Sequence, residues 1–391
     1  MTVHVRDRRG VRRIAAFIEQ NNVRYPAGEN TQSMKTADSS WSFTAGSKST
    51  PQLKDGSAKL ILEATSNDFM HKTAHWERDV RVITQLPTVA ADGIQHYLYL
   101  GMAEVATFNV AGGWTEAGVQ VGDEKFRAWP MPGGKSGMFS LFAFAWNMPP
   151  GTAPKVYASN GAGTDATAPL VVIFPKKEQP KYTQHDLQVS DAFLNKVVNE
   201  LDPSGSGDPV ARFVKVNSEM RRENNKTLAD LRFKTADHFL WSQTFARQHA
   251  ADEASFADFR NYIYHGKKID QQVHLGYDLA GTQHMGVQAS NDGRIVYAAP
   301  LGIYGNCIVV DHGFGLQTIY GHLSQIDVHV GDMVKRGQVM GLSGMTGMAG
   351  GDHIHFAMQL DGVQIDPKEW WDPHWIGDHI AKRVDLPGFR E

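Results

Sequence analysis

Short apolar runs separated by turn residues fill most of this 391-residue sequence, and this pattern is the strongest constraint on its fold. Up to about residue 176 the runs recur roughly every ten residues and alternate with polar positions, as in strands that bury one face. Such spacing is typical of β-sandwich modules. The sequence therefore predicts a mainly β protein. The clearest runs are 59–64, 80–83, 96–100, 106–110, 139–146 and 170–174.

The length of the chain and a change of texture near Leu86-Pro87 divide it further. One hydrophobic core stops growing near roughly 250 to 300 residues, so a chain of 391 residues is expected to hold several units. We predict two Ig-like β-sandwich modules at 1–80 and 81–178, a helical connector at 179–262, a strand-rich domain at 263–376 and a tail at 377–391.

The connector has the periodicity of helices. Ser190 is a candidate N-cap for a helix that ends at Asp202-Pro203, and Asp208-Pro209 opens a second helix. The apolar spacing of residues 256–263 predicts a third helix. Beyond residue 263 the sequence returns to strands with glycine-rich turns.

Charge and hydropathy exclude several classes of function. With 39 Lys+Arg against 42 Asp+Glu, the formal net charge is −3, so no overall positive field attracts nucleic acid or an anionic membrane. No window approaches the ~18 apolar residues of a membrane span, and no apolar signal follows the N-terminal basic residues. Because the sequence opens directly into a strand-like run, we expect that an export signal or anchor has been removed from it.

Some residues that often carry chemistry have a structural explanation here. Cys307, the only cysteine, lies in the apolar run 303–310 and is expected to be an inert core residue. His312 is expected to be a buried turn histidine. The aromatic side chains of the β-rich part are expected to fill cores rather than to form a sugar-binding face. These tryptophans are Trp41, Trp76, Trp114, Trp129 and Trp146.

Residues with catalytic potential concentrate in three histidine patterns of the last third of the chain. In the triplet from His353 to His355, both imidazoles leave the same face of a strand, with Cα atoms about 6.5 Å apart. One imidazole can then bind a metal while the other reaches a neighbouring water, or both can be ligands. The patterns are His274-Leu-Gly-Tyr-Asp278, Tyr320-Gly-His322-Leu-Ser324 and Asp352-His353-Ile-His355-Phe356.

His274 and Asp278 can share an ion only if the chain bends between them. In a flat strand they would lie about 13 Å apart. Gly276, midway between them, permits a bulge or bend. A helical turn would also bring positions i and i+4 together, but at the cost of a central glycine. We therefore expect a bent strand.

Imidazoles and a carboxylate around an open fourth position suit a catalytic Zn²⁺ better than Mg²⁺ or Ca²⁺, which prefer oxygen ligands. A structural zinc site would use cysteines, and this chain has one. Taken alone, His322 has an ordinary explanation as a residue that caps a hairpin. The joint occurrence of all three patterns within about 80 residues favours a single site.

The three patterns, in this order, resemble the lysostaphin/LytM-type zinc endopeptidases, whose sequences show H-x-x-x-D, then Y-x-H-L-S, then H-x-H. The connecting segments 305–313 and 330–338 are similar as well, and the resemblance covers about residues 265–373. It implies an antiparallel β peptidase domain. Two departures, the loop 349–352 and Ala357, bear on substrate fit more than on metal binding.

The resemblance also implies a role for each residue of the patterns. His274, Asp278 and His355 would hold one Zn²⁺ per chain, and His322 and His353 would be catalytic without binding the metal. In the expected mechanism, His353 takes the proton of the attacking water and His322 donates a hydrogen bond to the developing oxyanion. The substrate would be the cross-link peptides of bacterial peptidoglycan, which places the protein in the periplasm or cell envelope.

Two other functions compete with this interpretation. A LytM-like envelope regulator that activates amidases would have lost zinc ligands, whereas none is missing here. A wall-binding or adhesin protein would carry a silent peptidase fold, and both alternatives predict no cleavage of peptidoglycan. The sequence itself does not select between a D-Ala–diaminopimelate bond and a glycine bridge as the bond that is cut.

Overall fold

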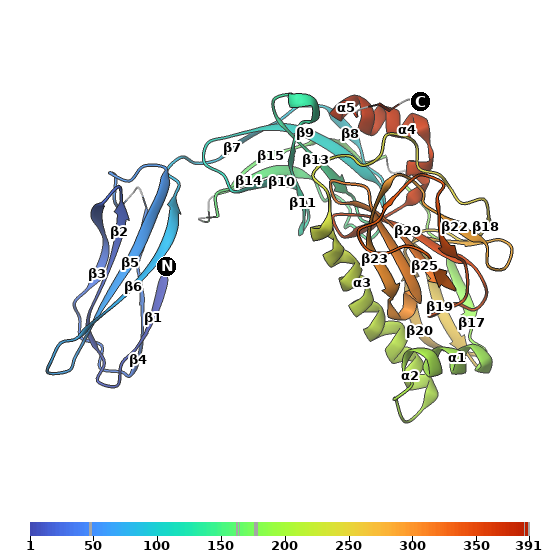
Figure 1. Ribbon diagram of the computed structural model, residues 1–391, viewed down its shortest axis with the longest axis horizontal. Coiled ribbons are helices and arrows are strands. Elements are labelled where there is room, and N and C mark those ends of the chain that lie inside the picture. The colour runs from blue at the N-terminus through green and yellow to red at the C-terminus, as the bar shows by residue number, and fades with distance from the viewer. Residues whose placement is uncertain (47–48, 162, 164, 176–178, 387, 390–391) are drawn as a thin grey trace. The chain divides into compact units, whose positions relative to one another are not determined.

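The structure, a computed structural model, describes residues 1–46, 49–161, 163, 165–175, 179–386 and 388–389. As predicted, it is mainly β (Figure 1). Among these residues no helix combines the length and the apolar character needed to cross a membrane. The boundary predicted at residue 178 lies outside the described residues, and the division into five parts stays a prediction. The chain separates into two compact units, Met1–Thr88 with Ala111–Thr115 and Ala158–Ala166, and Val89–Val110 with Glu116–Tyr157 and Thr167–Glu391.

The first unit is built mainly from antiparallel strands. Its strands are β1 Thr2–Arg6, β2 Val11–Gln20, β3 Val23–Asn30, β4 Asp38–Ser42, β5 Gly56–Ser66 and β6 Thr73–Val82. Four of them form a sheet with the order β3-β2-β5-β6, and β1 pairs with β4. Alternate side chains of the sheet, such as Ala16, Ile18 and Leu60, are buried together with Phe43.

The tryptophans of the predicted modules are less buried than expected. Trp76 is 48% exposed and Trp114 is 37% exposed, so the prediction that both fill cores is wrong. Trp76 lies on β6, an edge strand on which nearly every side chain is exposed. The other three are partly buried against aromatic rings, Trp41 on Phe43, Trp129 on Phe314 and Trp146 on Phe259.

Two further four-stranded sheets lie between residues 88 and 169. They are formed by β7 Thr88–Ala91, β9 Ala103–Ala111, β10 Glu116–Val121, β11 Glu124–Arg127, β12 Trp129–Pro130, β13 Met138–Ala143, β14 Lys155–Ser159 and β15 Asp165–Pro169. The orders are β11-β10-β14-β15 and β12-β13-β9-β7, and β8 (Gln95–Tyr97) pairs with β16 (Val171–Ile173). Because β13 contacts both β10 and β11, the two sheets share a core. The Ig-like character of the modules stays a prediction.

Residues 179–262, all of which the structure describes, contain three α-helices, and two of them begin directly after the expected capping residues. The helices are α1 Asp191–Leu201, α2 Pro209–Lys215 and α3 Arg221–Asp230, the last two joined by a π-helical turn. The Ser190 hydroxyl accepts a hydrogen bond from the Phe193 amide, and the Asp208 carboxylate caps α2. Both predicted helix starts are confirmed.

The third predicted helix, around 256–263, is wrong, because this segment is a strand. β19 (Asp258–Tyr264) pairs with β17 (Gln184–Gln188) on one side and with β20 (Lys267–His274) on the other. Its partner β17 lies far upstream in the chain, and this long-range pairing overrides the local helical spacing of apolar residues.

A larger sheet forms the C-terminal domain. Its strand order is β18-β21-β29-β25-β24-β23-β27, with β30 paired to β29. A small sheet with the order β22-β28-β26 lies in the same domain. The strands are β18 Ala251–Ala254, β21 Tyr277–Ala280, β22 Gly286–Gln288, β23 Gly293–Pro300, β24 Asn306–Asp311, β25 Leu316–Leu323, β26 Gln325–Ile326, β27 Met333–Val334, β28 Val339–Leu342, β29 Ile354–Leu360 and β30 Val363–Ile365.

The connector helices cover one face of this sheet. Val197 of α1, Phe213 of α2 and Leu228 of α3 belong to one buried cluster with Val309 and Ile319 of the sheet. Burial of such apolar surface is worth about 25 cal/mol per Å², so the helices are part of the core of this domain. Cys307 belongs to the same cluster, and burial raises the pKa of its thiol, which confirms its prediction as an inert residue.

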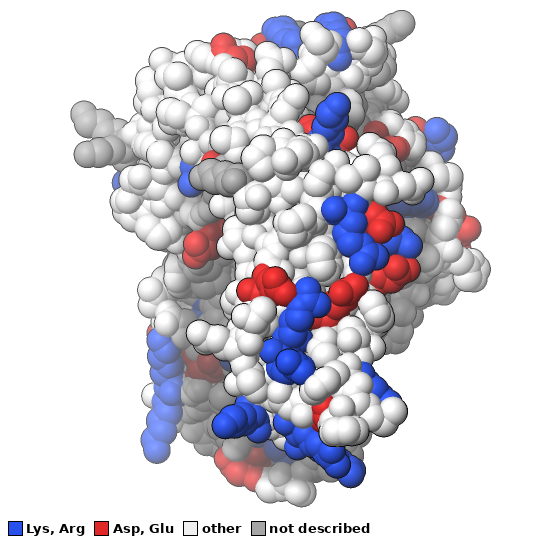
Figure 2. All heavy atoms as spheres, turned by 90° about the vertical axis from the view of Figure 1, so that its left-hand side faces the viewer, with Lys and Arg blue, Asp and Glu red and all other residues white. Residues whose placement is uncertain are grey.

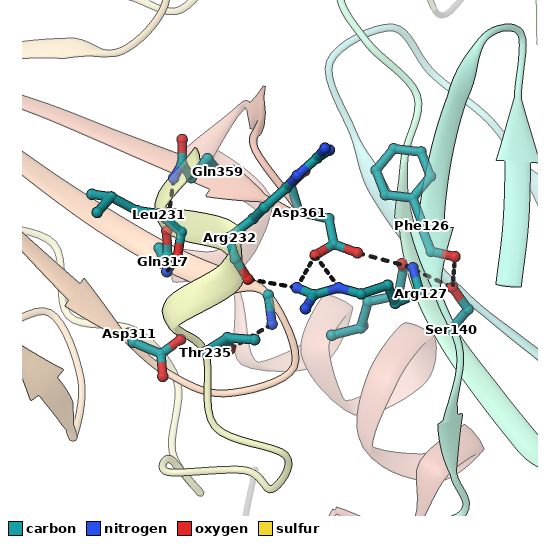
Figure 3. Close-up of polar contacts among 12 residues, drawn as sticks. Phe126, Arg127, Ser140, Leu231, Arg232, Thr235, Asp311, Gln317, Gln359 and Asp361 are labelled. Atoms are coloured by element: carbon teal, nitrogen blue, oxygen red, sulfur yellow. Dashed lines mark hydrogen bonds and ion pairs between the residues drawn. The ribbon is translucent and has the colours of Figure 1, made fainter. Parts of the chain in front are cut away.

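An ion pair within the second unit joins β11 to the turn after β29 (Figure 3). The Arg127 backbone amide donates to Asp361 Oδ2 at 2.9 Å, and its guanidinium Nε donates to Oδ1 at 3.0 Å. The same guanidinium donates to the Arg232 carbonyl oxygen at 2.6 Å. This paired, largely buried contact fixes the turn that ends the strand carrying His355.

Charged side chains of both signs are interspersed on the face of the molecule shown in Figure 2. This mixture agrees with the formal net charge of −3. Long-range steering by the whole protein is therefore weak, and local charges decide what each site attracts.

The C-terminal residues 373–384 form short helices against a buried polar cluster. Ile376, Ile380 and Val384 are buried there. Glu104 accepts a hydrogen bond from His379 at 3.0 Å. Although burial opposes its charge, hydrogen bonds from His379 and from His96 lower the pKa of Glu104 to about 2.

Glu369, in the 3₁₀ helix Pro367–Trp371, is a second buried acid, but its pKa is shifted in the opposite direction from that of Glu104. Burial raises its pKa to about 8. The folded protein therefore keeps this proton up to about pH 8, whereas the unfolded chain loses it near the ordinary value of 4.5. The free energy of unfolding should fall by a few kcal/mol between these pH values.

Glu369→Gln removes this titration, so the variant should gain stability over the wild type as the pH rises from about 5 to about 8. The measurement is the melting temperature of both proteins at several pH values, with exposed Glu124→Gln as the control. A constant difference across this pH range would contradict the assignment.

Candidate metal centre

Two side chains that lie four residues apart in the sequence and a third from about 80 residues downstream converge where β20, β21 and β29 meet. Asp278 of β21 lies directly opposite His355 of β29 in the antiparallel register. His274 ends β20, and its Nε2 lies 2.9 Å from Asp278 Oδ1 and 2.9 Å from His355 Nδ1. His355 Nδ1 lies 3.1 Å from the same carboxylate oxygen. The three atoms form a compact triangle in which all three residues are buried.

The predicted bend between His274 and Asp278 is present. The strand is interrupted at residues 275 and 276, so β20 ends and β21 begins around it. A Cβ atom on Gly276 would lie 2.6 Å from the Phe356 carbonyl oxygen and 2.7 Å from His355 Cε1. Glycine is therefore required at this bend because a side chain would have no room.

The chemistry of this triangle fits a metal ion. His274 Nδ1 lies 3.1 Å from the Ser255 carbonyl oxygen, which only accepts hydrogen bonds, so the ring hydrogen belongs on Nδ1 and a lone pair remains on Nε2. That lone pair points at a carboxylate oxygen. Ligand atoms about 2.1 Å from a tetrahedral Zn²⁺ lie about 3.4 Å apart, so a small outward shift of these three atoms would accommodate the ion.

The pKa shifts of Asp278 and His355 agree with this fit. Although burial opposes the charge of Asp278, the neighbouring histidines hold its pKa well below the usual range. Burial lowers the pKa of His355 to about 4. A deprotonated carboxylate and neutral imidazoles are the forms in which these side chains bind a metal.

His322 and His353, the other two predicted residues, flank the triangle without belonging to it. Their ring centres lie 4.8 Å apart, and the ring of His322 lies 6.0 Å from that of His355. His322 Nδ1 lies 2.9 Å from the Thr346 carbonyl oxygen, and His353 Nδ1 lies 2.9 Å from that of Gly351. Both rings therefore carry hydrogen on Nδ1, and Nε2 is left for chemistry.

Their environments differ in charge. Burial lowers the pKa of His322 well below its usual value. Burial also opposes the charge of His353, but Asp278, whose Oδ1 lies 3.5 Å from His353 Nε2, raises its pKa. His312, which was predicted to be a buried turn histidine, is confirmed as one. Its side chain is fully buried, and its Nδ1 lies 2.7 Å from the Asp292 carbonyl oxygen.

Arg260, which the sequence analysis missed, holds the second oxygen of Asp278. Its Nη2 donates to Asp278 Oδ2 at 2.7 Å, and its Nε lies 3.3 Å from Asp258 Oδ2. Asp258 in turn accepts hydrogen bonds from Thr183 and His185. Strand alternation places Asp258 and Arg260 on one face of β19, but the signal was hidden because this segment was interpreted as a helix.

A groove of about 650 Å³ opens beside the triangle. One part of its lining consists of His274, Asp278, His322, His353 and His355. Another part comes from upstream of the C-terminal domain, from β17, β19, α1 and α3. These upstream residues include His185, Leu187, Phe193, Arg221, Asn225 and Arg260.

Comparison with known proteins identifies the region that carries this site. Residues 272–367 match peptidase family M23, which confirms the resemblance to the lysostaphin/LytM-type peptidases for this part of the chain. DD-carboxypeptidase/endopeptidase Mpg of Neisseria meningitidis is 36% identical over 96 residues, 25% of this chain and 22% of Mpg.

Two other relatives match the same part of the chain but differ in described function. Peptidoglycan DD-endopeptidase ShyA of Vibrio cholerae is 40% identical over 120 residues, 29% of this chain and 28% of ShyA. Murein hydrolase activator EnvC of Escherichia coli is 33% identical over 95 residues, 24% of this chain and 23% of EnvC. In each case the match spans less than a third of the relative, so it concerns one domain only.

The contact between Arg260 and Asp278 predicts a role in metal affinity. Arg260→Met removes the donor that orients the carboxylate. Removing Arg260 also removes a positive charge that repels a metal cation, but Asp278 and Asp258 already offset that charge. The loss of the hydrogen bond that orients the Asp278 carboxylate should therefore be the larger effect. Zinc affinity, measured by competition with a chromophoric chelator, should fall about 10- to 100-fold.

Arg294→Met is the control, since Arg294 pairs with Asp311 at 3.8 Å and is not among the groove residues. Its zinc affinity should equal that of the wild type. Equal affinities in all three proteins would show that Arg260 does not orient the ligand.

Proposed function

We propose that this chain, which carries a peptidase family M23 domain at residues 272–367, is a zinc-dependent endopeptidase that cuts the peptide cross-links of bacterial peptidoglycan in the cell envelope. The proposal is carried by the convergence of His274 Nε2, Asp278 Oδ1 and His355 Nδ1 beside an open groove. Relatives named as peptidoglycan endopeptidases support the substrate class.

His274, Asp278 and His355 would hold one Zn²⁺ per chain. When bound, the ion supplies a Lewis acid that polarises a carbonyl group and lowers the pKa of water towards ~7. Burial of the three side chains keeps the ligand atoms fixed, and the lining of the groove leaves one side of the triangle open to substrate.

His353 and His322 supply the proton chemistry in this proposal. His353 lies on the side of Asp278, and its Nε2 accepts the proton of the attacking water. His322, held by its Nδ1–H on the Thr346 carbonyl, presents Nε2 to the groove. Because burial lowers its pKa, His322 takes up a proton from solvent at Nε2 only as negative charge develops on the scissile carbonyl. Its Nε2–H then donates a hydrogen bond to that oxyanion, a contribution worth ~3 kcal/mol in comparable sites.

A non-catalytic regulator is the second candidate, because the murein hydrolase activator EnvC matches the same domain. Regulation through protein contacts needs neither a complete ligand set nor paired histidines beside it. The buried triangle and the two rings that are held beside it through Nδ1 favour catalysis.

Replacing His322 or His353 by Ala tests their proposed roles. Each variant should lose peptide cleavage by about 100-fold or more and should still bind one zinc ion per chain, because neither ring belongs to the triangle. Cleavage is followed by mass spectrometry, and zinc content by atomic emission. His329→Ala, at an exposed histidine, is the control; loss of zinc in either test variant would make that residue a ligand.

The function itself is tested on purified peptidoglycan. The zinc-loaded protein should release new amino termini from cross-linked muropeptides. Asp278→Ala, which removes the carboxylate that contacts both His274 and His355, should release none. If the wild type binds zinc but leaves every cross-link intact, the regulator becomes the better assignment.

A further inference from the structure

The groove beside the metal centre contains an arginine whose charge is not neutralised. Arg221 begins α3 and lines the groove. Its Nε donates to the Asn217 carbonyl oxygen at 3.0 Å, and its Nη2 donates to Asn217 Oδ1 at 2.7 Å and contacts Met348 Sδ at 3.5 Å. Among the described residues it has no ion pair, and its Nη1 has no hydrogen-bond partner.

These contacts orient the guanidinium without cancelling its charge. The amide of Asn217 stands between Arg221 and the nearest carboxylate in this network, because Asn217 Nδ2 donates to Asp270 Oδ2 at 2.7 Å. The guanidinium is therefore held in place from one side. A half-buried cation held in this way retains donor capacity and a favourable field for an anion.

Arg260, the other groove arginine, differs from Arg221 in this respect. It contacts two carboxylates, those of Asp278 and Asp258. These two carboxylates offset the charge of Arg260, so a substrate anion would meet a guanidinium that is already neutralised. Arg221 is the arginine of the groove whose charge is available to a ligand.

Arg221 also lies close to the reacting centre. Asn225, four residues later on the same face of α3, accepts a hydrogen bond from the Tyr304 hydroxyl at 2.9 Å. The ring of Tyr304 lies 5.4 Å from the ring of His355. One aromatic side chain therefore separates this face of α3 from the ligand triangle.

We propose that Arg221 binds a carboxylate of the substrate peptide near the bond that is cut. This inference rests on the proposed function and specifies its substrate class. A guanidinium forms paired hydrogen bonds to a carboxylate, which an uncharged group cannot reproduce. The groove thus selects cross-link peptides with a free carboxylate beside the scissile bond, such as a D-Ala–diaminopimelate link, over an uncharged glycine bridge.

Two synthetic cross-linked peptides test the proposal, identical except that the carboxylate beside the scissile bond is free in one and a carboxamide in the other. The wild type should cleave the acid with a kcat/KM about 10- to 100-fold higher, the range expected for a charge-assisted hydrogen bond. Arg221→Gln should lose most of this preference because its kcat/KM for the acid falls, while its kcat/KM for the amide changes by less than about threefold. Arg221→Lys should restore part of the preference.

Arg222→Gln is the matched control, because Arg222 is the next residue of α3, is exposed and is not among the groove residues. It should behave as the wild type does. Melting temperatures and zinc content of all variants separate a specific effect from misfolding. If Arg221→Gln slows both peptides equally at full zinc content, Arg221 only supports the groove and the proposal is overturned.

Binding of the same peptides, measured by calorimetry, keeps this inference distinct from the proposed function. If the wild type cleaves neither peptide, the proposed function fails, but tighter binding of the acid that Arg221→Gln abolishes would still support the carboxylate site. Equal binding of acid and amide by the wild type would overturn the site whether or not cleavage occurs.

Discussion

Three atoms with lone pairs converge on one point in the C-terminal domain, and the rest of the site is arranged around this constraint. These atoms lie only 2.9 to 3.1 Å apart, so a small shift of any one of them would change the geometry of the site. The sheet must therefore hold each side chain in place. It does so because Asp278 and His355 are direct partners across two paired strands, and because the strands behind them are anchored in a core that includes Val309, Ile319 and Ala357.

Local physics explains which parts of the structure could be predicted from the sequence. Ser190 and Asp208 cap helices through contacts within three residues, and Gly276 permits a bend within its own segment. His353 and His355 share a strand face by alternation alone. These patterns, together with the resemblance to known peptidases, predict which residues lie at the site, whereas the meeting of Asp278 with His355 depends on the long-range pairing of β21 with β29.

Long-range pairing explains what the sequence concealed. The segment around 256–263 has helical apolar spacing, but it forms a strand because β17, more than 70 residues upstream, pairs with it in parallel. Arg260 was missed for the same reason, since only the strand conformation aims it at Asp278. Exposure of Trp76 likewise depends on its position on an edge strand, which no window of sequence specifies.

The groove and the metal centre come from different parts of the chain. The family match begins at residue 272, whereas α1, α3, β17 and β19 supply a large share of the groove lining. The reacting atoms can thus remain constant while upstream segments change the shape and charge of the groove. This division follows the general tendency of enzymes to keep chemistry on a rigid scaffold and to vary the surrounding segments.

The two parts are nevertheless physically connected through one chain of hydrogen bonds. Asp278 gives one oxygen to the triangle and the other to Arg260, Arg260 contacts Asp258, and Asp258 accepts from His185 at 2.7 Å and from Thr183 at 2.6 Å. His185 belongs to β17, which lines the groove. A shift of this strand would reach the carboxylate of Asp278 through two intervening side chains. The segment that shapes the groove therefore also helps to orient Asp278, so the shape of the groove and the geometry of the candidate metal ligands are not independent in this protein.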